Sequence, residues 1–294
     1  VQISASHNPP PYNGIKLFGD TGRVLDATRG AAIRDGYLAD EAAWVPFDRI
    51  GRYSVEADPH QAHLDKVLST VNIQAIQAAG LRVLLDSNHG AGSLLGKRLL
   101  EALGCQVMAI GDQPDGNFAH VPEPTAENLT GIAAKVREHD CVVGFCQDPD
   151  ADRLALVDGN GRYVGEEFTL ALCVQHALSQ EATRGSIVIN GATSGMSERL
   201  GMQAGIQVLR SAVGEANVAD MMIANHATYG GEGNGGPIDP RVGYVRDSFV
   251  GMAQVLDLMT STGKNLAQLA DALPKLHIHK TTATVSADRL PAQF

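Results

Sequence analysis

The order of hydrophobic and polar positions along the chain predicts an α/β protein. From residue 81 onward, apolar runs of strand length alternate with segments whose apolar residues recur at helical spacing. Such alternation is typical of largely parallel sheets covered by helices on both faces. The strands expected here are residues 81–86, 106–110, 141–146, 154–158, 187–190, 207–209 and 227–229. The helices expected here are 94–103, 125–138, 166–178, 194–204, 216–224 and 247–260.

The first 80 residues have a weaker pattern. Short strands are expected at 1–3, 15–18 and 23–25, and helices at 31–43 and 60–76. Further along, Gly159-Asn160-Gly161 predicts a hairpin between 154–158 and 162–164.

These elements predict successive similar three-layer α/β domains with mixed, largely parallel sheets around a shared cleft. In such sheets ligands collect at the carboxyl ends of strands. The expected divisions are a partial first domain at 1–78, a second domain at 79–165, a third at 166–274 and a linker at 275–294.

Composition narrows the choice of partners. The 294 residues are 44% hydrophobic and 19% charged, as in an ordinary globular protein. Lys plus Arg number 23 and Asp plus Glu 33, so the net charge of −10 argues against nucleic acid or an anionic membrane. The four cysteines show no C-x-x-C spacing and are interpreted as buried thiols. No apolar run reaches the ~20 residues of a membrane span and no leader opens the chain, which predicts a cytoplasmic protein.

Candidate chemistry begins almost at the first residue, with S-A-S-H-N-P at 4–9 and Y-N-G-I-K at 12–16. A turn with Ser6, His7 and, ten residues after the serine, Lys16 could hold an activated hydroxyl beside a proton carrier. The same residue types occur in any exposed turn, so a plain loop is the alternative at this point.

A second candidate is D-P-D-A-D-R at 148–153, directly after a predicted strand. In an extended segment Asp148, Asp150 and Asp152 would project to one side, and three carboxylates together favour Mg²⁺ or Ca²⁺. An EF-hand is excluded, because Arg153 stands where that loop requires glycine and Gly159 where it requires glutamate. An acidic turn is the alternative, but the neighbouring arginine, which can grip phosphate, favours a metal site.

A third candidate is the stretch G-G-E-G-N-G-G at 230–236. Its five glycines permit close backbone approach, and Glu232 and Asn234 suit the hydroxyls of a sugar. A phosphate-cradling loop is the rival, although the lysine of a P-loop is absent, and a flexible turn is also open. Upstream, Arg210 could serve a phosphate or form a surface salt bridge, and V-G-E-A-N-V follows at 213–218.

Together these motifs resemble the α-D-phosphohexomutases, a family of phosphoglucomutases, phosphomannomutases and phosphoglucosamine mutases. The resemblance rests on S-A-S-H-N-P with Y-N-G-I-K, D-P-D-A-D-R, G-E-G-N-G-G and V-G-E-A-N-V, in the family's order and across essentially the whole chain. It implies an isomerase that interconverts hexose 1-phosphate and hexose 6-phosphate through a phosphoserine and a 1,6-bisphosphate. Phosphomannomutase/phosphoglucomutase activity is preferred, with phosphoglucosamine mutase as the alternative.

The resemblance also implies roles for individual residues. Ser6 is the expected phosphoserine, with His7 and Lys16 as its polar and acid/base neighbours. Mg²⁺ is expected on Asp148, Asp150 and Asp152, with the Ser6 phosphate completing its shell. The residues expected to bind substrate are Arg153, Arg210, Glu232 and Asn234.

The family has four domains, so the sequence is expected to lack the opening of domain 1 and the whole of domain 4. The expected ligands are a hexose phosphate and a 1,6-bisphosphate activator, and the expected assembly is a monomer or homodimer. Two other classes use similar parts: a metal-dependent phosphatase with a serine nucleophile, and a non-catalytic sugar-phosphate binding protein.

Overall fold

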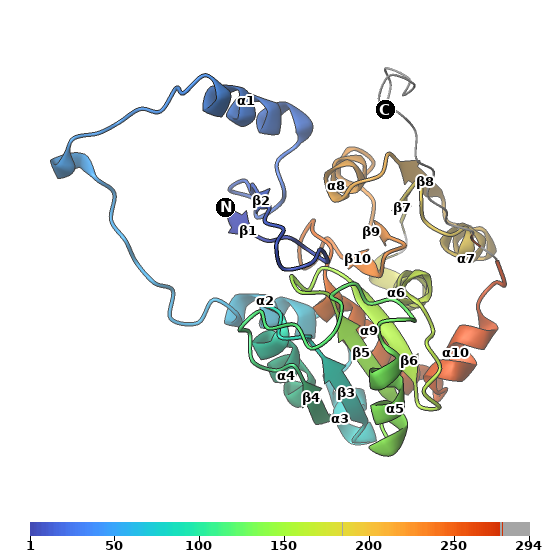
Figure 1. The fold of residues 1–294 in the computed structure, drawn as a ribbon. Helices are drawn as coiled ribbons and strands as arrows, with labels where there is room; N and C mark the ends of the chain where they lie inside the picture. Colours follow the sequence, from blue (N-terminus) through green and yellow to red (C-terminus); the bar gives the residue numbers. More distant parts are fainter. Residues whose placement is uncertain (184, 277, 279–294) are drawn as a thin grey trace, which may run out of the picture.

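Two four-stranded sheets with the same strand order form the centre of the fold (Figure 1). The computed structural model describes residues 1–183, 185–276 and 278, so most of the expected linker at 275–294 lies outside the described residues. The first sheet consists, in order, of β4 (Gln106–Ile110), β3 (Arg82–Asp86), β5 (Val143–Gln147) and β6 (Leu154–Asp158). The second consists of β8 (Val208–Ser211), β7 (Ile187–Asn190), β9 (Tyr229–Glu232) and β10 (Gly236–Ile238).

Each sheet has three parallel strands and one antiparallel edge strand. The matching order means that one α/β unit occurs twice, as the sequence predicted. The aspartate loop (148–153) joins β5 to β6, and the glycine loop (233–235) joins β9 to β10. These two loops therefore occupy the same place in the two units.

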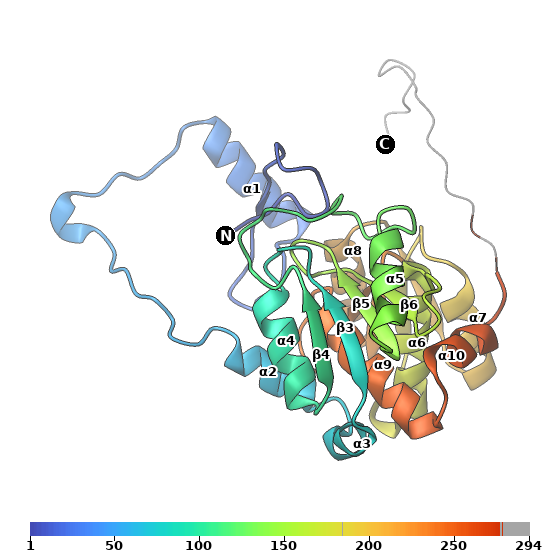
Figure 2. The ribbon, with the colours of Figure 1, turned by 60° about the horizontal axis from the view of Figure 1, so that its bottom comes forward.

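Helices cover both faces of the first sheet (Figure 2). On one face, Val83 and Leu85 of β3 pack in a large core with Leu99. On the other face, Leu84 packs with Val136 in a separate core. The helices that connect these strands are α4 (Ser93–Ala102) and α5 (Thr130–Glu138).

The second sheet also has helices on both faces, which makes a second three-layer unit. Val188 of β7 packs with Met222 on one face, whereas Ile187 and Ile189 face the large core. The helices that border this sheet are α6 (Glu166–Ser179), α7 (Met196–Ala204) and α8 (Glu215–Ala224).

Helix α9 (Ser248–Thr262) is central to the packing. Eleven of its 15 residues are buried, and its apolar side chains belong to the large core that includes residues of both sheets. Asp257 of this helix also accepts a hydrogen bond of 2.7 Å from the buried His176 on α6. The two units thus share one continuous core. The short α10 (Leu266–Ala272) follows, with a capping box between Asn265 and Gln268.

The first 60 residues pack loosely on the remainder. β1 (Gln2–Ile3) and β2 (Ile15–Lys16) pair with each other, and α1 (Ala27–Leu38) has no buried residue. Figure 1 shows the segment that follows, with the short 3-10 helix η1 (Phe47–Arg49), reaching away from both sheets. The serine loop (residues 4–14) and Lys16 contact the aspartate loop as described below, and Arg23 pairs with Asp220 of α8.

Several element boundaries differ from the sequence prediction. The helix expected at 60–76 is two helices, α2 (Gln61–Leu68) and α3 (Ile73–Ala79), because Asn72 caps a new helix by accepting from Ala75 N. The helix expected to start at Thr125 begins at Thr130, and the Asn128 amide before it donates to the Glu123 carbonyl. Further differences are single Phe18–Val24 and Val157–Tyr163 bridges in place of the strands expected at 23–25 and 162–164, and the unpredicted β10, α10, η1 and η2 (Glu181–Thr183).

The helix expected at 31–43 lies earlier in the chain, because Asp26 caps α1 by accepting from Arg29 N. Among the described residues, no helix combines the length and the apolar character needed to cross a bilayer.

Candidate active site

The serine loop contacts the aspartate loop directly. Ser6 adopts a left-handed backbone conformation with φ of 52°, and its N–H donates to Ser4 Oγ at 2.9 Å. Ser4 Oγ in turn donates to Asp150 Oδ2 at 2.8 Å. A non-glycine residue with positive φ is uncommon and often marks a functional turn. Two segments 146 residues apart thus meet at the predicted nucleophile.

The Ser6 hydroxyl lies 3.2 Å from His7 Nδ1, within hydrogen-bonding distance. Burial and the nearby charge of Arg153 lower the pKa of His7, although Glu123 opposes this effect. The imidazole is therefore biased toward its neutral form, in which one ring nitrogen can accept a proton.

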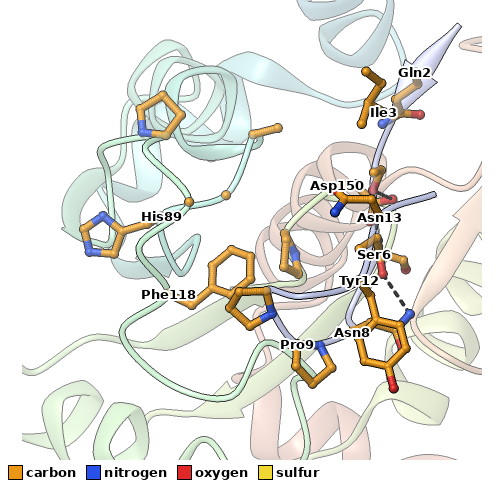
Figure 3. Close-up of a pocket in the computed structure, with 18 residues that line it drawn as sticks. Gln2, Ile3, Ser6, Asn8, Pro9, Tyr12, Asn13, His89, Phe118 and Asp150 are labelled. Atoms are coloured by element: carbon orange, nitrogen blue, oxygen red, sulfur yellow. Dashed lines mark hydrogen bonds between the residues drawn. The ribbon is translucent and has the colours of Figure 1, made fainter. Parts of the chain in front are cut away.

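A cavity of about 340 Å³ borders the same loop (Figure 3). Ser6 and Tyr12 lie on one side of it, and His89 and Phe118 lie on the opposite side. The space beside Ser6 is therefore formed by the serine loop together with loops of the first α/β unit.

The three aspartates converge as predicted. Asp148, Asp150 and Asp152 each offer a carboxylate oxygen within 4.8 Å of the others. Within the triad, one buried oxygen of each aspartate has no hydrogen-bond partner among the described residues: Asp148 Oδ2, Asp150 Oδ1 and Asp152 Oδ1. The nearest ion-pair contacts of two of these atoms are 3.8 Å and 3.9 Å, both to Arg153 Nε. Buried unpaired carboxylate oxygens are costly, and a hard cation would satisfy all three.

Protein donors hold the second oxygen of each aspartate. Arg153 N donates to Asp148 Oδ1 at 3.0 Å. Lys16 Nζ donates to Asp150 Oδ2 at 2.7 Å and to Asp152 Oδ2 at 3.1 Å. Each carboxylate is thereby oriented with one oxygen held and one available, the pattern of outer-shell support that metal ligands commonly have.

Charge crowding shifts the pKa values of the cluster. Burial, reinforced by the charges of Asp152 and Asp150, raises the pKa of Asp148 well above its ordinary value. Burial also acts to raise the pKa of Asp150, but the Lys16 and Ser4 hydrogen bonds outweigh it and lower that pKa. Without a cation, the ionised form of the most buried member, Asp148, is therefore disfavoured.

Two carboxylates set the pKa of Lys16 in this structure. Burial acts to lower it, but the charges and hydrogen bonds of Asp152 and Asp150 outweigh burial and raise the pKa of Lys16. Lys16 therefore favours its charged form beside Asp150 and Asp152.

The glycine loop packs tightly against the aspartate loop and α6. Leu154 N donates to Gly235 O at 3.1 Å, and a Cβ on Gly235 would lie 2.2 Å from Leu154 O. A Cβ on Gly233 would lie 2.1 Å from a carboxylate oxygen of Glu167. Gly235, with φ of 81° and backbone in close contact, therefore requires glycine, which argues against the flexible-turn alternative.

A second cavity, of about 280 Å³, lies beside the glycine loop. Glu232 Oε1 accepts from Asn190 Nδ2 at 2.7 Å and from Gly214 N at 3.0 Å. Glu232 Oε2 accepts from Asn234 Nδ2 at 3.2 Å. The polar residues that line this cavity are Arg153, Glu167, Asn190, Glu215, Glu232, Asn234 and Arg246.

The structure places Arg210 away from that cavity's lining. Its guanidinium pairs with Glu198 at 2.8 Å and donates to the carbonyls of Asn190, Gly191 and Thr193. These contacts fit the salt-bridge alternative better than the phosphate role, since they use the arginine to fix the β7–α7 turn.

Sequence reasoning missed Arg246, Glu215 and Ser4. Arg246 Nη2 donates to Asp152 Oδ2 at 2.6 Å, and its Nε donates to Glu215 Oε2 at 3.0 Å. Arg246 lies in no glycine-rich or acidic motif, whereas Glu215 and Ser4 lie inside motifs that were recognised. Attention to every polar side chain in those motifs would have found Ser4 and Glu215.

The fold and these contacts define an α/β protein in which a serine, a carboxylate triad and a glycine loop surround one polar region. Three successive segments match domains of one family, Phosphoglucomutase/phosphomannomutase: residues 1–43 match alpha/beta/alpha domain I, 61–161 domain II and 166–277 domain III. The chain belongs to this family, the α-D-phosphohexomutases.

Individual relatives agree with this assignment. A phosphoglucomutase/phosphomannomutase of Thermococcus kodakarensis is 36% identical over 288 residues, covering 98% of this chain and 63% of the relative. A phosphoglucosamine mutase of Synechococcus elongatus is 34% identical over 275 residues, covering 92% and 57%. The chain thus spans less than two thirds of the length of these relatives.

A solved structure has the same fold. The phosphoglucomutase/phosphomannomutase family protein of Burkholderia thailandensis superposes with a TM-score of 0.79 at 23% identity. The match covers 93% of this chain and 58% of that one.

Proposed function

We propose that the protein is a phosphohexomutase that interconverts hexose 1-phosphate and hexose 6-phosphate. The observation that carries the proposal is the contact between the serine loop and an aspartate triad with three available oxygens. Two contacts support it: Ser6 Oγ lies 3.2 Å from His7 Nδ1, and Lys16 Nζ donates to Asp150 Oδ2 at 2.7 Å.

In the proposed reaction, Ser6 carries a phosphoryl group. A sugar hydroxyl attacks that phosphorus, the P–O bond to Ser6 Oγ breaks, and a hexose 1,6-bisphosphate forms. After the bisphosphate reorients, Ser6 Oγ attacks its other phosphorus and the second hexose monophosphate leaves. Atoms balance, and no other reactant is consumed. The same 1,6-bisphosphate would phosphorylate an idle Ser6, which makes it the expected activator.

The residues have distinct proposed roles. Asp148, Asp150 and Asp152 would hold Mg²⁺, which supplies charge neutralisation for phosphoryl transfer when bound, with the Ser6 phosphate as a further ligand. Lys16 would exchange the proton of the sugar hydroxyl and His7 would orient the serine. Arg153, which lines the cavity beside the glycine loop, would contact phosphate there.

We assign Glu232 and Asn234 to the sugar hydroxyls, because both line the smaller cavity. Phosphomannomutase/phosphoglucomutase activity is the first choice and phosphoglucosamine mutase the second, since relatives of both names match at similar identity. Arg210 stays a weaker proposal as a phosphate contact, since its donors are occupied.

Phosphorylation of Ser6 is the direct test. Incubation of the full chain with glucose 1,6-bisphosphate and Mg²⁺ should add one phosphoryl group, located at Ser6 by mass spectrometry, and Ser6→Ala should add none. With glucose 1-phosphate as substrate, a mutase gives glucose 6-phosphate, a phosphatase gives free phosphate and a binding protein gives neither. Labelling of another residue, or none, would refute the nucleophile assignment.

Substrate preference and assembly need separate measurements. Turnover of mannose 1-phosphate, glucose 1-phosphate and glucosamine 1-phosphate would rank the substrates, and equal rates would remove the basis for our order. We propose a cytoplasmic monomer or homodimer, which light scattering during gel filtration would distinguish from larger assemblies.

A further inference from the structure

The buried guanidinium of Arg246 joins three carboxylates from separate segments. Its Nη2 donates to Asp152 Oδ2 at 2.6 Å and its Nε to Glu215 Oε2 at 3.0 Å. Its Nη1 lies 3.1 Å from Glu232 Oε2. The Arg246 side chain is only 9% exposed, so water has little access to these contacts.

The partners of Arg246 belong to different parts of the proposed site. Asp152 is a proposed metal ligand in the aspartate loop, and Glu232 is a proposed sugar ligand at the end of β9. Glu215 is the first residue of α8 and lines the smaller cavity. One side chain therefore contacts both the cation-binding and the sugar-binding parts.

Packing fixes the Arg246 side chain in this position. A Cβ on Gly236 would lie 2.6 to 2.9 Å from the aliphatic carbons of Arg246, so the arginine lies directly over that glycine. The next residue, Asp247, caps α9, and its N–H donates to Pro237 O at 2.9 Å. Arg246 thus packs against Gly236 of β10, and its chain neighbour Asp247 is fixed at the start of α9.

We propose that Arg246 is a positioning residue that sets the relation between the metal ligand Asp152 and the sugar ligand Glu232. This inference rests on the proposed function. A guanidinium is suited to the role because its planar N–H groups reach several acceptors at once, whereas an ammonium acts as a point charge. Asp152 Oδ2 is held by Arg246 and Lys16, so the other oxygen is aimed at the triad.

Loss of Arg246 would act on both parts together. The three carboxylates of Asp152, Glu215 and Glu232 would then lose their shared cation. Arg153 would be the arginine that remains in the cavity lining. Their mutual repulsion would turn Asp152 away from its metal-binding orientation and release Glu232 from its sugar-binding one. Outer-shell losses of this kind typically cost about 10- to 100-fold in metal affinity.

The test measures Mn²⁺ binding to the folded full chain by electron paramagnetic resonance. Arg246→Met should weaken Mn²⁺ binding by about 10- to 100-fold, and Arg246→Lys by an intermediate factor. The matched control is Arg241→Lys, because Arg241 lies in the same connection and pairs with Asp239 at 2.6 Å. It should change Mn²⁺ affinity by less than about twofold. Added guanidinium ion should restore part of the affinity of Arg246→Ala.

The outcomes separate this inference from the proposed function. Unchanged Mn²⁺ affinity in Arg246→Lys overturns this inference but leaves the proposed function standing. This measurement decides even if Arg246→Met fails to fold. Equal weakening by Arg241→Lys overturns it too, since the effect would then be general. A folded wild-type chain that binds no Mn²⁺ overturns the proposed function and this inference with it.

Discussion

At the residue scale, Asp148 carries the largest electrostatic cost of the triad. It is fully buried, and Asp150 and Asp152 lie beside it. Burial and these two charges raise its pKa, so the ionised form is disfavoured without a cation.

Asp148→Asn should therefore stabilise the metal-free protein. Removal of one buried negative charge relieves the repulsion, and each kcal/mol gained raises Tm by about 2–4 °C. Thermal denaturation in EDTA measures this change. Mg²⁺ should raise the Tm of the wild-type chain but leave that of the variant unchanged, and a lower Tm in EDTA would contradict the prediction.

The sequence predicted some site residues better than others. Asp148, Asp150 and Asp152 lie in one compact motif, so local spacing was enough to bring their carboxylates together. Arg246 could not be found in this way, because its partners are Asp152, Glu215 and Glu232 from three distant segments. The direction of the Lys16 pKa shift likewise depends on carboxylates more than 130 residues away.

At the element scale, Asp247 fixes the start of α9. Its side chain accepts from Phe249 N and Val250 N at 2.8 Å and 3.2 Å. Asp247→Ala should lower the free energy of unfolding by about 1–2 kcal/mol, measured by urea denaturation. Asp247→Asn is the matched control, because asparagine caps helices about as well as aspartate. Equal losses in the two variants would show that capping is not the cause.

The segment around His120 is attached to the end of β3. His120 Nε2 lies 2.8 Å from Asp86 Oδ2, and the Asn88 side chain bonds the backbone of Ala119 and His120. Burial acts to lower the pKa of His120, but the hydrogen bond and charge of Asp86 outweigh it and raise the pKa.

This pair should make stability depend on pH. Because the folded-state pKa of His120 lies above the unfolded one, its contribution is complete below about pH 6.5 and is lost as pH rises through the folded-state pKa. The stability difference between wild type and His120→Gln should therefore be larger at about pH 5.5 than at about pH 8.5. Urea denaturation at both pH values measures it, and a constant difference would exclude the effect.

Element boundaries show where local sequence signals compete. The strand at Ile187–Asn190 was predicted without error, because its apolar run is bounded by glycines. Asn128 and Asn72 both resemble helix caps, yet only Asn72 caps a helix. The Asn128 side chain instead donates its amide to the Glu123 carbonyl, before α5 begins at Thr130.

At the scale of the whole molecule, α9 makes the two units one cooperative structure. Leu256 of this helix is fully buried and belongs to the large core. Leu256→Ala should cost about 2–5 kcal/mol. Hydrogen exchange should show equal loss of protection in β3 and β7, because both face this core. Loss confined to one sheet would mean that the units unfold separately.

The repeated strand order was predictable as alternating strands and helices, but the shared core was not. Periodicity places apolar residues on one face of a helix, and does not say which of two sheets that face meets. The division at 78, 165 and 274 thus stays a prediction, since packing across α9 does not follow those limits.

The way the aspartates are held bears on which cation they select. A carboxylate binds Ca²⁺ through both oxygens only if both are free, and Ca²⁺ takes 6–8 oxygen ligands. Here protein donors occupy one oxygen of each aspartate, which leaves three inner oxygens. A smaller ion that keeps several of its own waters suits such a sparse shell. Mg²⁺ should therefore compete with bound Mn²⁺ more strongly than Ca²⁺ does, and a competition titration that ranked Ca²⁺ first would show that the carboxylates rotate freely.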